Sequence, residues 1–183
     1  MILYITWSRI LKLCVPPKVR VFWWRVVNDF LPAKDVLNRR HIEPIANCDV
    51  CGDDKESVKH VLLECTVAKF FWNQTKTMSG VKIPPLHPLT WARDLVDPGC
   101  VPPKDAAVIL CGMWALWMAR NSRRHGEEPR PVRVAAQWAI DTAFDLWQLI
   151  HPEKERRSTG IPKFWERPAG HRLGKIQIGR AHV

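Results

Sequence analysis

The 183-residue sequence lacks the signatures of the common enzyme classes. It contains no P-loop, no Ser/His/Asp pattern and no aspartate pair of the polymerase type, so we expect no catalytic activity. Asp141 and Asp145 share one face of a predicted helix. Two carboxylates on an amphipathic helix are usually solvated charges, so this pair does not suggest an active site.

Long hydrophobic runs and targeting signals are also missing. The longest apolar run, residues 106–119, has fourteen residues, which is too short to span a bilayer and predicts a buried helix. The opening MILYITWSRILKLC has no basic region before its apolar run and no small-residue cleavage site, which argues against a signal peptide. We therefore expect an intracellular protein, nuclear or cytoplasmic, without a membrane partner. Because that environment is reducing, the six cysteines favour metal binding over disulfide bonds.

Acidic residues and tyrosine are scarce. Asp and Glu total 18 against 28 Lys and Arg, which gives a net charge of +10 and a pI of about 9.7. This basic balance favours a polyanionic partner, with RNA or DNA as the first candidate, although a basic surface can also serve solubility alone. One Tyr stands against ten Trp, and Trp side chains bury large areas, so we expect a core built around tryptophans.

Three cysteines and one histidine gather in the pattern Cys48-x2-Cys51-x8-His60-x4-Cys65, a ligand set that suits tetrahedral Zn²⁺. The two-residue gap lets Cys48 and Cys51 point to the same side of a tight turn, and Gly52 follows where the chain must turn. His60 lies on a predicted helix, and Cys65 lies just past its last turn, where the helix end can direct it toward the metal. One such cysteine alone would more often be a small buried hydrophobe, but four residues at this spacing are hard to explain that way.

Four protein ligands leave no open position for water, which indicates a structural rather than a catalytic zinc site. We expect residues 45–66 to collapse without metal, because they have no strong apolar core of their own. His41 and His87 are alternative ligands but fit ordinary loop histidines better. The remaining cysteines have no partner spacing, and the one within the apolar run is expected in the core; they are Cys14, Cys100 and Cys111.

The hydrophobic pattern predicts a mainly α fold. Helices are expected between Pro16 and Pro32, within 33–42, 56–65 and 66–77, and at 104–124 and 132–150. We divide the chain into a small zinc-stapled helical domain, a Pro-rich linker, a helical hairpin and a flexible, disordered tail, at residues 1–80, 81–103, 104–151 and 152–183.

Positive charge collects before the metal motif. Residues 1–41 hold eight Lys and Arg against two Asp, whereas residues 46–66 hold five Asp and Glu against two Lys. Because an acidic loop without aromatic side chains repels phosphate, we expect nucleic-acid contacts from the flanking helices instead. Trp24, off the main apolar stripe, is a candidate either for base stacking or for packing against another helix. The expected phosphate-binding residues are Lys18, Arg20, Arg25, Arg39 and Arg40.

This first half resembles the zinc-binding domain that follows the reverse transcriptase in plant LINE-type (non-LTR) retrotransposons. The resemblance covers about residues 4–75 and lies in VPPKVRVFWWRVVNDFLPAKDVLNRRHI, CDVCG, ESVKHVLLEC and VAKFFW. It implies zinc on the same four residues, Cys48, Cys51, His60 and Cys65. It also implies a non-catalytic, nucleic-acid-associated module of a retrotransposon polyprotein, with the polymerase and ribonuclease H domains of that polyprotein as partners. The alternative is a protein-interaction or spacer module without direct nucleic-acid binding.

The second half carries a weaker resemblance. MWALWMARNSRRHG resembles the Trp-x-x-Arg-Asn helix that such elements have between the zinc domain and ribonuclease H, and FWERPAGHRLGKIQIGRA resembles the entry to ribonuclease H. Lys175, Ile176 and Ala181 fit the first strand of that domain, but Gly179 stands where the family has its first catalytic Asp. We interpret residues 178–183 as a translated sequencing-library adapter joined to a truncated transcript, a hypothesis that resequencing of the locus tests.

Overall fold

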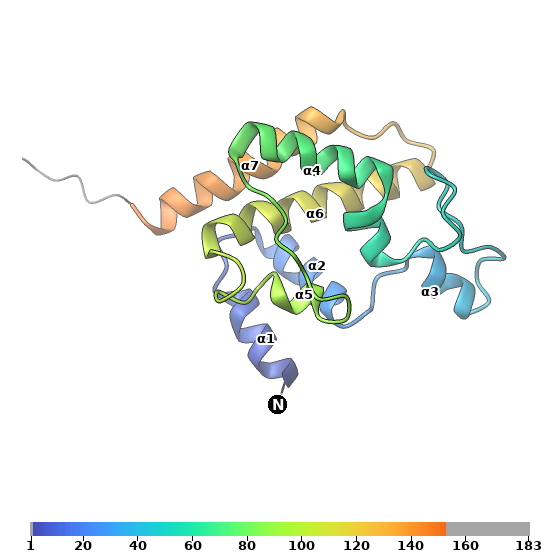
Figure 1. The fold of residues 1–183 in the computed structure, drawn as a ribbon, viewed down its shortest axis with the longest axis horizontal. Helices are drawn as coiled ribbons and strands as arrows, with labels where there is room; N and C mark the ends of the chain where they lie inside the picture. The colour runs from blue at the N-terminus through green and yellow to red at the C-terminus, as the bar shows by residue number, and fades with distance from the viewer. Residues whose placement is uncertain (1, 153–183) are drawn as a thin grey trace, which may run out of the picture. The chain divides into compact units, whose positions relative to one another are not determined.

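A computed structural model describes residues 2–152, which are helical and contain no β-strand within that range (Figure 1). The predicted mainly α fold is therefore confirmed. Residues 153–183 lie outside the described residues, and with them the predicted tail, the ribonuclease H-like stretch and the adapter-like end. The elements are α1 (Ile2–Leu11), α2 (Pro17–Val27), α3 (Lys34–Arg39), the π-helical turn η1 (His60–Glu64), α4 (Thr66–Ser79), α5 (Trp91–Asp94), α6 (Pro103–Arg124) and α7 (Val132–Ile150).

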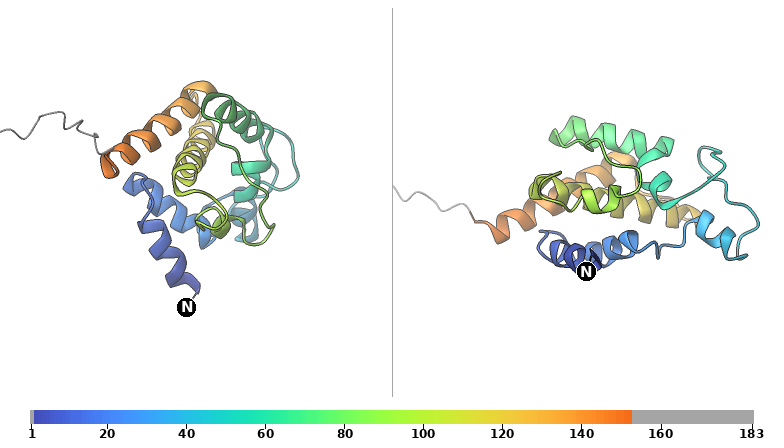
Figure 2. Two further views of the ribbon diagram at one scale, coloured as in Figure 1. Left: turned by 60° about the vertical axis from the view of Figure 1, so that its left-hand side comes forward. Right: turned by 60° about the horizontal axis from the view of Figure 1, so that its bottom comes forward.

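Helix α6 lies at the centre of the compact unit formed by residues 1–153. It packs against α7 and η1 and against α2, while α4 packs against α7, so that in Figure 2 (right) α6 runs between α4 and α2. Eleven of its residues are buried, eight of them consecutive. A helix that is apolar all round must be covered on all sides, which is why the long apolar run of the sequence became the core helix.

Small residues allow the helices around α6 to approach closely. A Cβ atom on Gly112 would lie 2.8 Å from a ring carbon of Trp72 and 2.9 Å from a ring carbon of Phe71, both on α4. The buried residues of α7 are all alanines, spaced by one, three and four positions: Ala135, Ala136, Ala139 and Ala143. Because these alanine side chains are short, the backbone of α7 can approach its neighbours closely. The large side chains of the core therefore come from α2, α4 and α6.

Tryptophans anchor this core, as the composition predicted, and two of them also satisfy their indole N–H groups. Trp23 of α2 is fully buried and donates to the carbonyl of Ala92 at 3.1 Å. Trp72 of α4 donates to the carbonyl of Leu62 in η1 at 2.8 Å. A buried indole needs such a partner, so each bond also fixes the position of a neighbouring element. The second bond ties α4 to the turn that precedes it.

The predicted bounds of the last two helices agree with the structure to within one residue, whereas the N-terminal helix α1 was not foreseen. The Pro-rich stretch at 81–103 contains α5 and contributes Leu95, Val96 and Val101 to the core. The subdivision at residues 80 and 103 stays a prediction about which parts fold independently, since residues on both sides share one hydrophobic core. No helix in the described range is long and apolar enough to cross a membrane.

Candidate metal centre

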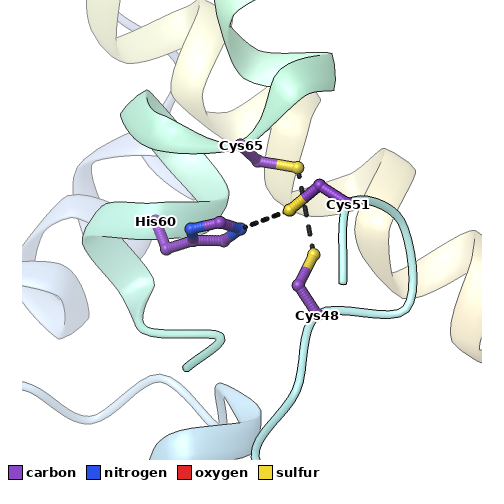
Figure 3. Close-up of side chains that lie close together, drawn as sticks. All are labelled: Cys48, Cys51, His60 and Cys65. Atoms are coloured by element: carbon purple, nitrogen blue, oxygen red, sulfur yellow. Dashed lines mark hydrogen bonds between the residues drawn. The ribbon is translucent and has the colours of Figure 1, made fainter. Parts of the chain in front are cut away.

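The first two cysteines lie on a tight turn. The Cys48 N–H donates to the carbonyl of Asp53 at 2.8 Å, and the Gly52 N–H donates back to the carbonyl of Cys48 at 2.9 Å. Gly52 has a φ of 77°, in the left-handed region that glycine adopts without a Cβ penalty. The turn therefore directs the side chains of Cys48 and Cys51 to the same side, as the two-residue spacing predicted (Figure 3).

The second ligand pair lies at the helix predicted within residues 56–65, but the turn there is π-helical, which the sequence did not indicate. The hydroxyl of Ser57 accepts the N–H of His60 at 3.0 Å, and the Cys65 N–H then donates to the carbonyl of His60 at 2.8 Å. This bond spans five residues, which makes the turn π-helical rather than α-helical. Residues five apart lie on different faces of an α-helix, with 3.6 residues per turn, but come nearly into line in the wider π-turn. The wider turn thus brings His60 and Cys65 to one side.

The four side chains point toward one another from these two elements (Figure 3). All ligand atoms lie within 4.8 Å of one another. The Sγ atoms of Cys48 and Cys65 are 3.9 Å apart, and Cys51 Sγ is 3.3 Å from His60 Nε2. A tetrahedron with Zn–S near 2.3 Å and Zn–N near 2.05 Å has edges of about 3.8 Å between sulfurs and about 3.5 Å between sulfur and nitrogen. The donor set and its spacing therefore fit one tetrahedral ion.

The cysteine environments differ. Burial raises the pKa of the Cys48 thiol to about 11, against the effect of hydrogen bonds from the backbone N–H groups of Cys51 and Val50. The pKa of Cys51 is lowered, chiefly by the backbone N–H of Asp53. Metal binding requires thiolates, so an ion must displace protons here. The two ring nitrogens of His60 have different neighbours. Asp53 Oδ2 lies 3.7 Å from Nδ1, whereas Nε2 is the nitrogen near Cys51 and therefore the one that faces the cluster.

The other sequence candidates stay outside this cluster. His41 and His87 are exposed and are not among the four clustered residues. Cys111 is fully buried in α6, as expected for a core residue, and burial raises its pKa to about 12. Cys14 is buried and Cys100 is exposed. All six cysteines are free thiols.

Two of the four acidic residues of the metal loop, which we define as residues 46–57, form ion pairs with the surrounding helices. Asp49 pairs with Lys34 at the start of α3, and this lysine is buried. Glu56 pairs with Arg120 of α6, with both side chains buried. The negative charge that was expected to repel phosphate thus fastens the loop to its neighbours. Sequence reasoning missed both contacts, because the partners are 15 and 64 residues away.

The five expected phosphate-binding residues do not form one cluster of contacts. Lys18 and Arg25 are exposed on α2, seven residues apart and therefore on the same face. Arg39 pairs with Asp29 at 3.5 Å, and Arg40 is exposed beside it. Arg20 is half-buried, with a buried Nε that has no hydrogen-bond partner within the described residues. Their role in nucleic-acid binding stays a prediction.

Lys18 adjoins an aromatic hollow that the sequence did not indicate. Its Nζ lies 5.9 Å from the ring centre of Trp114 on α6 and 5.6 Å from that of Trp138 on α7. These three residues, with Arg130 and Ser122, help to line a hollow of about 300 Å³.

Trp24, the candidate for base stacking, is 38% exposed and contacts Trp7 and Phe30 edge to face. It is thus only half-covered by its neighbours.

The metal motif lies in a segment that is similar to a known family. Residues 4–72 match the family described as zinc-binding in reverse transcriptase. A curated Arabidopsis thaliana protein named for ribonuclease H is 25% identical over 138 residues, which cover 71% of this chain but only 22% of that protein. No solved structure matches the chain significantly. The matched segment contains all four clustered residues, so residues 4–72 are similar to a zinc-binding domain of the reverse-transcriptase type.

Proposed function

We propose that this chain is a non-catalytic module in which one Zn²⁺ joins the turn at Cys48 and Cys51 to the π-turn between His60 and Cys65. The observation that carries the proposal is the convergence of three sulfurs and one imidazole nitrogen within 4.8 Å. Thiolate and imidazole donors in a tetrahedral arrangement favour zinc over the oxygen-seeking cations Mg²⁺ and Ca²⁺.

The proposed ion has a structural role. Four protein ligands complete its coordination, and a catalytic zinc keeps a position for water or substrate. Three thiolates also leave the site with a net charge of about −1, which makes the metal a poor Lewis acid. The similarity to a family named for zinc binding supports zinc as the ion.

Metal analysis tests this proposal. The purified chain should contain one zinc per molecule, and Co²⁺ substitution should give the absorption of a tetrahedral site with thiolate charge transfer. The change Cys48→Ser should abolish both signals, because it removes one of four ligands. Cys100→Ser is the matched control, since Cys100 is exposed and outside the cluster. Substoichiometric zinc, or equal loss in both variants, would refute the proposal.

We further propose that the module associates with single-stranded RNA or DNA through α2 and the adjoining aromatic hollow. Lys18 and Arg25 offer two positive charges on one helix face, and the indole rings of Trp114 and Trp138 beside Lys18 suit the stacking of a base. The net charge of +10 supports this choice of partner. Binding of this kind would be independent of base sequence and sensitive to salt.

The salt dependence of binding to a random single strand tests this part. Loss of two phosphate contacts in Lys18→Ala/Arg25→Ala should make the negative slope of log K against log salt shallower by about 1.4, at about 0.7 for each contact. The control Lys76→Ala/Lys82→Ala removes the same charge from exposed lysines of α4 and the following loop and should leave a steeper slope. Equal slopes for the two double variants would contradict the proposed surface.

One observation favours the alternative, a protein-interaction or spacer role. The C-terminal half of α7 exposes large apolar side chains, with Leu149 77% exposed, together with Phe144 and Ile150. In a longer polyprotein this surface could face the polymerase or ribonuclease H domains. A zinc-loaded chain that binds no nucleic acid at low salt would support this alternative over the nucleic-acid role.

A further inference from the structure

The Trp-x-x-Arg-Asn sequence of α6, at Trp117, Arg120 and Asn121, lies outside the segment that matches the zinc-binding family. Its arginine nevertheless reaches the metal loop. Arg120 is only 6% exposed and Glu56 only 3%. The Arg120 Nη2 and Nε atoms donate to Glu56 Oε1 at 2.6 and 3.1 Å. A charge pair this deeply buried is costly to form unless further hydrogen bonds satisfy both side chains.

On the loop side, Glu56 closes the metal loop. Its N–H donates to the carbonyl of Ala46 at 2.7 Å, which joins the two ends of the segment that carries Cys48 and Cys51. Its carbonyl accepts the N–H of Asp35 at 3.2 Å, and its carboxylate accepts the N–H of Lys34 at 3.3 Å. Glu56 therefore connects both ends of the loop with the start of α3.

On the helix side, the other two motif residues hold the guanidinium. The Arg120 guanidinium carbon lies 4.9 Å from the ring centre of Trp117, one turn earlier on α6. Its Nη1 donates to Asn121 Oδ1 at 3.1 Å. The Trp117 ring lies against one face of the guanidinium. The Asn121 amide oxygen accepts a hydrogen bond from Nη1, the nitrogen that does not donate to Glu56. These contacts give each of the three motif residues a role in directing the arginine at the loop.

The same helix face also borders the cluster itself. Leu116, Arg120 and Arg123 of α6 line a small hollow together with Cys48 and Cys65. Glu56 lines the same hollow, so the Arg120–Glu56 pair is in the immediate surroundings of two ligands.

We propose that Arg120 is a positioning residue for the metal centre, which holds the turn of Cys48 and Cys51 in the geometry that one ion requires. This inference rests on the proposed zinc function. It makes α6 a part of the metal centre's support, although α6 follows the matched family segment by some thirty residues. Groups that orient metal ligands from outside the coordination sphere typically change metal affinity by about 10- to 100-fold when lost.

A chelator competition on the full chain tests the inference, with hydrogen exchange as a second readout. In Arg120→Met, zinc affinity should fall at least tenfold, and amide exchange should accelerate in residues 46–56 but not along α6 and α7. The matched control is Arg124→Met, which removes an ion pair between the same helix and Glu43 and should change neither readout. Unchanged affinity in Arg120→Met, or uniform acceleration along the whole chain, would overturn the positioning role.

A second variant covers the case in which Arg120→Met does not fold. Arg120→Lys keeps the positive charge but loses the planar, two-nitrogen contact with Glu56, so its zinc affinity should fall while the chain stays folded. Native zinc affinity in a folded Arg120→Lys protein would count against the proposal. A wild-type chain that binds no zinc would instead refute the proposed function, so the two failures are distinguishable.

Discussion

The metal loop and the α6–α7 hairpin are stabilised in different ways. Between residues 46 and 57 only Cys48 and Glu56 are buried, and both act through specific polar contacts. In α6 alone eleven residues are buried, ten of which are not charged. Burial of apolar surface is spread over many contacts, whereas the loop depends on four ligand atoms and a few ion pairs. We therefore expect metal loss to unfold the metal loop and to leave the α6–α7 hairpin folded.

Loss of the metal is expected to have the largest effect. Structural zinc contributes about 10–16 kcal/mol of apparent binding free energy in zinc-finger peptides at neutral pH. In Cys65→Ser, or after chelation, amides of residues 46–57 should lose protection from hydrogen exchange while those of α6 and α7 keep it. Exchange measured residue by residue checks this difference. Loss of protection in both regions at once would show that the two are not separable.

A change in the hairpin should have the opposite pattern. Gly112→Val places a side chain against Phe71 and Trp72, and overpacking of this kind costs about 1–3 kcal/mol. Denaturant unfolding should show a lower midpoint, while the chain still binds one zinc, since no ligand is touched. Zinc loss in a folded Gly112→Val protein would mean that α4 transmits the strain to Cys65.

The smallest effect is expected at the exposed pair between Arg9 and Asp97, which joins α1 to the loop after α5 at 2.8 Å. The pKa of Asp97 is lowered from 3.8, first by the backbone N–H of Gly99 and then by Arg9. Because the pKa of Asp97 is lower in the folded than in the unfolded chain, its carboxylate stabilises the fold at pH values above the unfolded-state pKa. This contribution is lost as the pH falls through the folded-state pKa.

The variant Asp97→Asn should therefore melt slightly below the wild type at pH 7, and the difference should vanish in acid below the lowered pKa. Thermal melts at a series of pH values check this. A difference that grows in acid would reverse the assigned sign.

The sequence predicted the parts of this molecule that depend on local pattern. The ends of α6 and α7 followed from the apolar spacing of residues 104–124 and 132–150. The four clustered residues followed from ligand spacing. These signals lie within a few residues of the feature that they predict, so a single sequence contains them.

Features that depend on distant contacts were not predictable. The π-turn has a hydrogen bond from the Cys65 N–H to the His60 carbonyl that spans five residues, which no residue type specifies. The pairing of Glu56 with Arg120 joins residues 64 positions apart. In α4 the apolar Phe70 is 54% exposed, whereas the buried face is formed by Ala68, Phe71, Trp72 and Thr75. Tertiary packing chose between two adjacent helix faces.

X-ray absorption at the zinc edge of the purified chain tests the central claim most directly. The account predicts three sulfur neighbours at about 2.3 Å and one nitrogen at about 2.0–2.1 Å, with four-coordinate geometry. A first shell that includes oxygen, or fewer than three sulfurs, would contradict a closed site formed by Cys48, Cys51, His60 and Cys65.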